Sequence, residues 1–343
     1  MKTLKRVSLI ILSLLVLAAA GILLLRTLND KKYGEPGPHG AKYYQKPTDW
    51  SLYPTTIPGL SVTEVHEKTL QGFHFQPEKT KYQGVIVCYG GSEGGPNFDT
   101  ARALAEAGYE TLAVFMYGMP EQPASLVRVP LEQFSDVLTY IRQTHDEKEP
   151  ITVVGASKGA EYALNLATKY PEITNVIALA PSAYNYAGLD NETVGSSWTW
   201  QGQDLPFIDF RRSSLGALVK GILWPSLTKS IVTYRNTYQS AVEQDDQAAK
   251  KRIPVENSKA HFLLLAGEDD QVWDSAGMGK ILKEQAPKQI QLEIYPHAGH
   301  IFSGDGFLNL SNMRLSTGGE TKANQKAGQK SQQAIQQFLK TYH

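Results

Sequence analysis

The sequence predicts an α/β fold, with a mostly parallel central sheet flanked by helices. Apolar runs typical of strands alternate with segments of helical spacing along most of the chain, which indicates a parallel sheet with helices on both faces. With 343 residues and 41% hydrophobic side chains, the chain can bury a substantial core, and its 20% charged content is ordinary for a folded protein.

The expected strands are short runs of alternating or apolar residues. Leu60–Val65 and Gly72–Gln76 alternate between apolar and polar positions, as half-buried strands do. The runs that follow are mostly apolar, as expected for strands covered on both faces. These strands are expected at Gly84–Tyr89, Thr111–Tyr117, Ile151–Gly155, Asn175–Ala180, Phe262–Gly267 and Ile290–Tyr295.

The expected helices lie between these strands and at the end of the chain. Gly108 is a typical residue to end a helix, and apolar residues recur at helical spacing after Pro130. Residues 182–260 break the alternation with a mixed, aromatic-rich pattern; we expect a lid or pocket-forming insertion, and an ordinary excursion packed on the body is the alternative. The helices are expected at Asp99–Ala107, Pro130–Thr144, Lys158–Tyr170, Ser275–Gln285 and Ala323–Tyr342.

The N-terminal segment predicts a membrane helix. Residues 7–25 contain no charged side chain, and a helix of this length spans roughly 28 Å, close to the hydrocarbon thickness of about 30 Å. We expect residues 1–28 to form an uncleaved single-pass anchor; a cleaved signal peptide and a buried core helix are the alternatives. The flanking charges favour, by a small margin, a cytoplasmic N-terminus and an extracytoplasmic body at the cell membrane.

Residues 29–58 are rich in Lys, Gly, Pro and Tyr and predict a linker, which leaves residues 59–343 as one domain. The formal charge of zero is uneven: residues 1–32 hold six basic residues and one acid, and the rest holds 28 basic and 33 acidic residues. A zero total argues against a nucleic-acid partner. The sole cysteine, Cys88, excludes an internal disulfide and a cysteine-based zinc site, and we expect no metal or cofactor.

The clearest chemical motif is Gly155-Ala-Ser-Lys-Gly159. A G-x-S-x-G pattern between a predicted strand and a predicted helix is typical of a nucleophilic serine on a tight turn. The helix N-terminus beneath it contributes the positive end of a dipole. We therefore expect Ser157 to be a nucleophile; a turn serine that caps the helix is the alternative.

A serine nucleophile needs a base, and in this arrangement an acid and then a histidine follow it along the chain. His300 lies in a loop after the last predicted strand and is the expected base, with His297 as the alternative. Asp270, in the turn after the preceding strand, is the expected acid that orients the histidine, with Asp269 as the alternative.

A glycine-rich segment, Gly90–Gly95, follows the predicted strand Gly84–Tyr89. Glycines there let backbone N–H groups approach a substrate, and we expect the amides of Ser92 and Lys158 to bind the developing oxyanion. A phosphate-binding loop is the competing interpretation, but no G-K-[ST] follows the glycines.

With these motifs, the chain resembles the C-terminal catalytic domain of the acyl-CoA thioesterase and bile acid-CoA:amino acid N-acyltransferase family, within the α/β-hydrolases. The resemblance implies an α/β-hydrolase fold, a Ser157–Asp270–His300 triad, and hydrolysis or transfer of acyl groups from thioesters. The family's transferases use a cysteine nucleophile, so a serine favours hydrolysis. The segments that carry the resemblance are Gly155–Glu161, Ser197–Phe207, Ile253–Glu256, Gly267–Trp273, Ala298–His300 and Gly318–Gly319.

The expected function is therefore a membrane-anchored serine hydrolase that cleaves a small-molecule acyl ester or thioester through an acyl-enzyme. The expected partners are that substrate and, through the N-terminal helix, the lipid bilayer. An acyltransferase or peptidase of the same fold and a non-catalytic binding protein are the alternatives. An extracytoplasmic body would not meet CoA, so the leaving group stays open.

Overall fold

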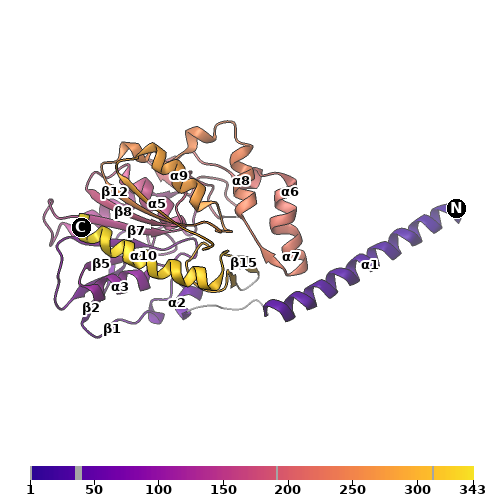
Figure 1. Ribbon diagram of the computed structural model, residues 1–343, viewed down its shortest axis with the longest axis horizontal. Helices are drawn as coiled ribbons and strands as arrows, with labels where there is room; N and C mark the ends of the chain where they lie inside the picture. Colours follow the sequence, from indigo (N-terminus) through magenta and orange to yellow (C-terminus); the bar gives the residue numbers. More distant parts are fainter. Residues whose placement is uncertain (1, 35–40, 191, 311–312) are drawn as a thin grey trace.

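The computed structural model describes residues 2–34, 41–190, 192–310 and 313–343 (Figure 1). A nine-stranded sheet lies at its centre, in the order β1-β2-β3-β5-β4-β7-β8-β12-β13. The strands from β5 to β13 in that order pair in parallel, whereas β1, β2 and β3 pair antiparallel and β3 joins β5 antiparallel. The predicted mostly parallel sheet is confirmed.

Every predicted strand is present in this sheet, with ends that differ from the predicted ones by at most three residues. The central strands are β1 (Thr56–Ile57), β2 (Leu60–Glu67), β3 (Leu70–Pro77), β4 (Val85–Tyr89), β5 (Glu110–Val114), β7 (Ile151–Ala156), β8 (Ile173–Leu179), β12 (His261–Gly267) and β13 (Ile290–Tyr295). Two small sheets have the orders β10-β9-β6 and β11-β15-β14. Their strands are β6 (Val129–Pro130), β9 (Trp198–Trp200), β10 (Gln203–Asp204), β11 (Ile231–Val232), β14 (Phe307–Asn309) and β15 (Arg314–Ser316).

Helices cover both faces of the sheet and create two apolar cores. The predicted helix at Pro130–Thr144 is shorter than expected, because a 3-10 turn over Leu131–Gln133 precedes α4. One core lies under α4, α5 and α9, and the other under α3 and α10. The covering helices are α3 (Phe98–Ala107), α4 (Phe134–Ile141), α5 (Lys158–Ala167), α9 (Ser275–Gln285) and α10 (Thr321–Tyr342).

The insertion at residues 182–260 contains short elements rather than one long helix. Its first part, through β9 and β10, packs beside α5, and its middle part forms a continuous helical segment over Leu215–Thr228. The middle segment consists of α6 (Leu215–Leu218), a π-helical turn (Val219–Leu223) and α7 (Trp224–Thr228). The other elements of the insertion are β11, α8 (Arg235–Glu243) and 3-10 turns at Phe210–Arg212, Ala248–Lys251 and Val255–Asn257.

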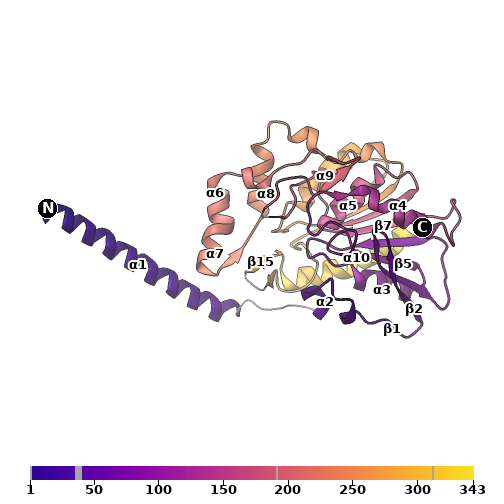
Figure 2. The same cartoon turned by 180° about the vertical axis from the view of Figure 1, so that it is seen from behind.

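The N-terminal helix α1 (Lys2–Tyr33) projects away from the body (Figures 1 and 2). Its span from Arg6 to Tyr33 is long and apolar enough to cross a membrane, and its apolar window is not buried in the body. The helix continues past residue 28 into the predicted linker, of which residues 35–40 lie outside the described residues. The later linker residues form α2 (Lys42–Gln45), a 3-10 turn (Trp50–Leu52) and β1 on the body.

Candidate active site

The predicted site residues lie at one edge of the central sheet. Ser157 follows β7, Asp270 follows β12, and His300 follows β13, while the glycine-rich segment Gly90–Gly95 follows β4. These strands are parallel to their neighbours, so their carboxyl ends meet at the same edge. Clefts at this edge are the usual ligand site of open parallel sheets.

Ser157 occupies a strained turn between β7 and α5. Its φ of 55° and ψ of −118° are unusual for a residue with a side chain, and such strain is often stored at functional sites. The turn needs glycine at position 159, because a Cβ there would overlap the Gly90 carbonyl oxygen. Within the described residues the Ser157 hydroxyl has no hydrogen-bond partner, and the bond to a base often forms only when substrate binds.

Asp270 and His300 form a buried pair. The Nδ1–H of His300 donates to Oδ2 of Asp270 at 2.8 Å, and the two residues are 8% and 0% exposed. Asp270 Oδ1 accepts the backbone N–H groups of Val272 and Trp273, at 2.9 and 3.2 Å, which holds the carboxylate in place. The His300 backbone N–H donates to the Thr317 carbonyl at 2.7 Å. His300 thus presents its Nε2 away from the acid.

The two alternative residues lie in other environments. Asp269 accepts the Gly319 N–H at 2.9 Å and the Gln271 side-chain amide at 2.7 Å, so it stabilises the turn. His297 is exposed, and among the described residues it has no carboxylate partner for its ring. Of the four candidates, only Asp270 and His300 are brought together by the structure.

The glycine-rich loop contains an acid that the sequence analysis did not single out. Glu93 accepts the Gly91 N–H through Oε1 at 2.9 Å. The Glu93 side chain is accessible to solvent, although protein atoms surround most of it. This partial burial raises the pKa of the Glu93 carboxyl, whereas the hydrogen bond from Gly91 and the nearby His300 act to lower it. A Cβ on Gly91 would lie 3.3 Å from that of Ser157, so this loop borders the nucleophile candidate.

The predicted oxyanion donors remain available. In the described part of the chain, the backbone N–H groups of Ser92 and Lys158 donate to no other group. Lys158 is the first residue of α5, where an N–H has no partner within the helix. The Ser92 carbonyl accepts the Tyr117 hydroxyl at 2.7 Å, which ties the loop to the chain after β5.

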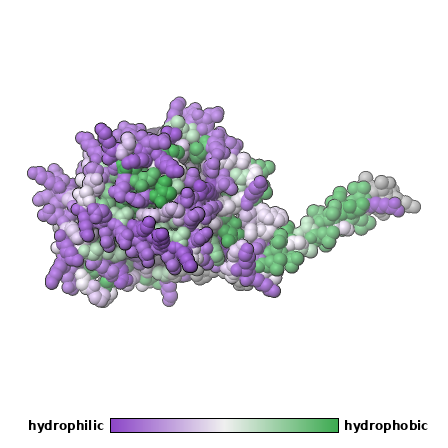
Figure 3. Space-filling view, viewed as in Figure 1, coloured by the Kyte–Doolittle hydropathy of each residue, from purple (hydrophilic) through white to green (hydrophobic). Residues whose placement is uncertain are grey.

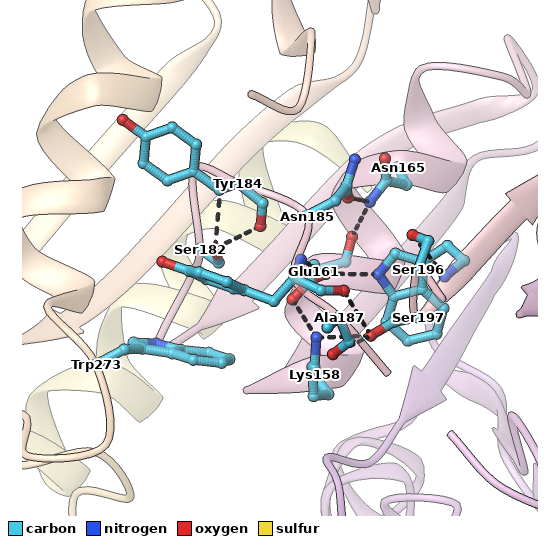
Figure 4. A network of polar contacts seen from close by, with 12 residues as sticks. Lys158, Glu161, Asn165, Ser182, Tyr184, Asn185, Ala187, Ser196, Ser197 and Trp273 are labelled. Carbon is cyan, nitrogen blue, oxygen red and sulfur yellow. Dashed lines mark hydrogen bonds and ion pairs between the residues drawn. The ribbon is translucent and has the colours of Figure 1, made fainter. Parts of the chain in front are cut away.

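A buried polar network involves Lys158 and Glu161 in the first turn of α5, directly after Ser157 (Figure 4). The Lys158 ammonium donates to Glu161 Oε2 and to the Ser197 hydroxyl, both at 2.8 Å, and the Lys158 side chain is only 1% exposed. Glu161 Oε1 accepts the Tyr186 backbone N–H at 2.9 Å and the Trp198 indole N–H at 2.8 Å. Burial lowers the pKa of Lys158, and the Glu161 carboxylate opposes this. The network joins α5 to the insertion.

Two further polar residues, both missed from the sequence, support the histidine loop. Asn324 of α10 accepts the Gly299 N–H at 2.7 Å and donates to the Gly318 carbonyl at 3.2 Å. Thr317 holds the His300 backbone, as described above. The sequence signal nearby was the Gly318–Gly319 pair, which is one of the segments that carry the family resemblance.

A cavity of about 480 Å³ lies away from these residues, at the far end of α5. None of the described residues that line it belongs to the predicted triad or to the oxyanion donors. Asn165, Lys169, Leu205, Arg252 and Gln285 are among them. We therefore place the candidate site at the sheet edge, where the chemical groups converge.

Comparison with known proteins decides the family. Residues 129–343 match the model of the family described as BAAT / Acyl-CoA thioester hydrolase C terminal. The chain belongs to this family. Its domain has the α/β-hydrolase fold, as expected from the sequence.

The relatives in this family are longer than the matched chain. Human acyl-coenzyme A thioesterase 1 is 26% identical over 294 residues, which is 82% of this chain and 65% of that protein. Mouse bile acid-CoA:amino acid N-acyltransferase is 26% identical over 299 residues, or 83% of this chain and 66% of that protein. The chain thus spans just under two thirds of these relatives. An esterase structure from Pyrococcus furiosus covers 82% of this chain and 92% of its own, with a TM-score of 0.47 and 13% identity.

Proposed function

We propose that this protein is a membrane-anchored serine hydrolase that cleaves an acyl ester or thioester. Ser157 Oγ attacks the acyl carbon while His300 Nε2 takes its proton, and the amides of Ser92 and Lys158 bind the oxyanion. The protonated histidine then gives the proton to the leaving alcohol or thiol. Water, activated by the same histidine, attacks the acyl-enzyme and releases the acid and the free serine.

The observation that carries the proposal is the buried Asp270–His300 pair at the sheet edge where Ser157 occupies its strained turn. A buried carboxylate on Nδ1 fixes the tautomer that leaves Nε2 free to accept a proton, and it stabilises the imidazolium that follows. Membership of the thioester hydrolase family supports the acyl substrate. The serine nucleophile favours water over an amine as acyl acceptor.

The exposed apolar α1 supports the anchor part of the proposal. From the charges that flank this helix, we propose that the body lies on the extracytoplasmic side. On that side CoA is not expected, so we propose an oxygen ester or a thioester of another thiol as the substrate. A topology reporter at the C-terminus tests this directly: an extracytoplasmic signal supports it, and a cytoplasmic one restores acyl-CoA as the substrate.

The catalytic part is tested with the full chain in detergent micelles, supplied with a soluble butyryl ester and a matched thioester. Turnover of either by the wild type supports the proposal, and Ser157→Ala should reduce it by at least about 10⁴-fold. The exposed Ser226→Ala is the matched control and should keep wild-type rates. Turnover that survives in Ser157→Ala, or a folded wild type that hydrolyses neither substrate, contradicts the proposal.

A further inference from the structure

The helical segment Leu215–Thr228 carries an apolar face that the body does not cover. Leu215, Val219, Leu223 and Leu227 recur every fourth residue and are 73, 39, 55 and 46% exposed, and Trp224 beside them is 50% exposed. Residues at this spacing share one side of a helix. We call these five residues the Leu215–Leu227 face. Contiguous apolar surface of this kind usually marks an interaction site.

This exposure does not come from a loosely attached segment. On the opposite side of the helix, Gly221, Pro225 and Thr228 are buried. The Gly221 carbonyl accepts the Thr233 N–H at 3.0 Å. A Cβ on Gly221 would lie 2.6 Å from the Thr233 carbonyl, so the helix is packed closely against the body. The segment is amphipathic in place, with one side fixed and the other open to the surroundings.

The end of this segment contacts the last turns of α1. The Asn29 side-chain amide donates to the Thr228 carbonyl at 2.9 Å, and the Lys229 ammonium lies 2.8 Å from an Asp30 oxygen. Asp30 also pairs with the buried Arg314 of β15 at 2.6 Å. The apolar helix α1 therefore leaves the body at the end of α7. These contacts fix the position of α1 relative to the Leu215–Leu227 face.

The figures show how the two helices are oriented. In both opposed views, α6 and α7 lie on the side of the body from which α1 departs, and they run across the direction of α1 (Figures 1 and 2). The apolar surface of α1 extends outward along the helix (Figure 3). A bilayer crossed by α1 would meet the body at this side. Helices that lie in the plane of a membrane interface have such an apolar face and basic residues at its border, and here Lys220, Lys31 and Lys32 are exposed nearby.

We infer that the Leu215–Leu227 face lies in the bilayer interface beside α1, and that the active site receives its acyl substrate from membrane lipid. Both halves of this inference rest on the proposed function, the first on the membrane anchor and the second on the hydrolase activity. Lipid is the occupant that the structure favours, because the face adjoins a helix that is long and apolar enough to cross a bilayer. An acyl chain in the bilayer would then lie on the same side of the body as the candidate site.

Contacts made by the chain that follows α7 connect this region to the loops of the candidate site. After α7, β11 pairs with β15, and the next residue after β15, Thr317, binds the His300 backbone. Arg235, at the start of α8, donates to the Asp270 carbonyl at 2.9 Å. The chain that follows the Leu215–Leu227 face thus borders both the acid and the histidine loop, which places the site on the same side as the proposed membrane contact.

Fluorescence quenching tests the location of the face without reference to catalysis. The full chain is placed in phosphatidylcholine vesicles with brominated acyl chains, and the Trp224 signal is obtained as the difference from Trp224→Phe. We expect bromolipid to quench this difference signal at least about twofold, whereas Trp200→Phe, a half-buried control, should leave the bromolipid quenching unchanged. Quenching by aqueous iodide alone would overturn the inference, as would protection from both quenchers, which indicates a second protein copy on the face.

Kinetics test the lipid-borne substrate. We expect Leu223→Gln/Leu227→Gln to lower turnover of a long-chain ester embedded in vesicles by about tenfold or more, because each buried leucine contributes to interfacial binding. Turnover of a soluble butyryl ester should stay within about twofold. Val194→Gln, an exposed apolar residue outside the face, is the matched control. Equal effects on both esters, or no effect on either, would overturn the inference. A wild type that is inactive on both esters would instead overturn the proposed function. In that case the fluorescence quenching experiment alone would test whether the face lies in the bilayer interface.

Discussion

The two edges of the central sheet both carry histidine–carboxylate pairs, but the surroundings of these pairs differ. At the amino end of β5, Glu110 Oε1 lies 2.7 Å from Nε2 of His74 and 3.1 Å from Nε2 of His145. At the carboxyl edge, His300 donates to Asp270 at 2.8 Å. Distance alone does not separate these pairs.

What separates them is the second ring nitrogen. His145 also contacts Glu149 at 2.6 Å, and His74 also contacts the Tyr140 hydroxyl at 2.9 Å, so both rings are fully engaged. The Nε2 of His300 has no partner among the described residues, and it lies at the edge that holds Ser157. We infer that a histidine with a free ring nitrogen at the edge that holds Ser157, rather than the ion pair itself, marks the candidate site.

The largest expected effect is the difference in kcat between removing His300 and removing His145. We expect His300→Ala to lower kcat for ester hydrolysis by at least about 10⁴-fold, because the serine loses its base. His145→Ala should leave kcat within about threefold, and so should His297→Ala. Steady-state kinetics on the folded variants measure both. A loss in His297→Ala as large as that in His300→Ala would show that the base is assigned to the wrong residue.

The acid assignment predicts a loss of kcat that is at most as large as the loss in His300→Ala. Asp270→Asn should lower kcat by about 10⁴-fold, since the amide favours the wrong histidine tautomer, with KM nearly unchanged. Asp269→Asn, the neighbouring turn residue, should lower kcat by less than about tenfold. If Asp269→Asn instead causes the large loss of kcat and Asp270→Asn the small one, Asp269 is the acid and the Asp270–His300 pair, at 2.8 Å, is structural.

The buried network of Lys158 and Glu161 should affect the free energy of unfolding. Glu161→Leu leaves the Lys158 ammonium buried without its anion, and we expect the free energy of unfolding to fall by about 3–5 kcal/mol. The double variant Lys158→Met/Glu161→Leu should recover at least half of that loss, because no lone charge remains. Urea unfolding in mild detergent measures both. A double variant less stable than Glu161→Leu would contradict the charge explanation.

The smallest effect concerns the amino-edge cluster. Burial alone would lower the pKa of His145, but its bonds to Glu149 and Glu110 raise it above the ordinary value of 6.5. Because the folded-state pKa is the higher one, the stabilisation is complete below about pH 6.5 and is lost as pH rises through the folded value. We expect the stability difference between wild type and His145→Gln to shrink as the pH rises above about 6.5. A difference independent of pH in this range would show that the cluster binds a neutral histidine.

Local patterns in the sequence were sufficient for the strands, the main helices and the Ser157 motif, because apolar periodicity and glycine spacing are local signals. The family resemblance is confirmed. The hydrogen-bond partners of Lys158 and Glu161 could not be predicted from the sequence. Ser197 and Trp198 lie in an insertion whose path no periodicity indicates.

The contacts at the end of α1 were equally hidden. Arg314 pairs with Asp30 across 284 positions of sequence, and a lone arginine in a short strand indicates no such partner. The Leu215–Leu227 face was also missed, because apolar residues at helical spacing predict a helix but not which side the fold leaves uncovered. Both features depend on tertiary packing rather than on local pattern.

The central claim, that Ser157 is a nucleophile activated by His300, is tested most directly by covalent labelling. The full chain in detergent is treated with a fluorophosphonate, and the modified peptide is identified by mass spectrometry. The account predicts a single adduct on Ser157, with labelling at least about 10³-fold slower in His300→Ala and unchanged in His145→Ala. An absence of labelling in folded protein, or an adduct on another serine, would contradict it.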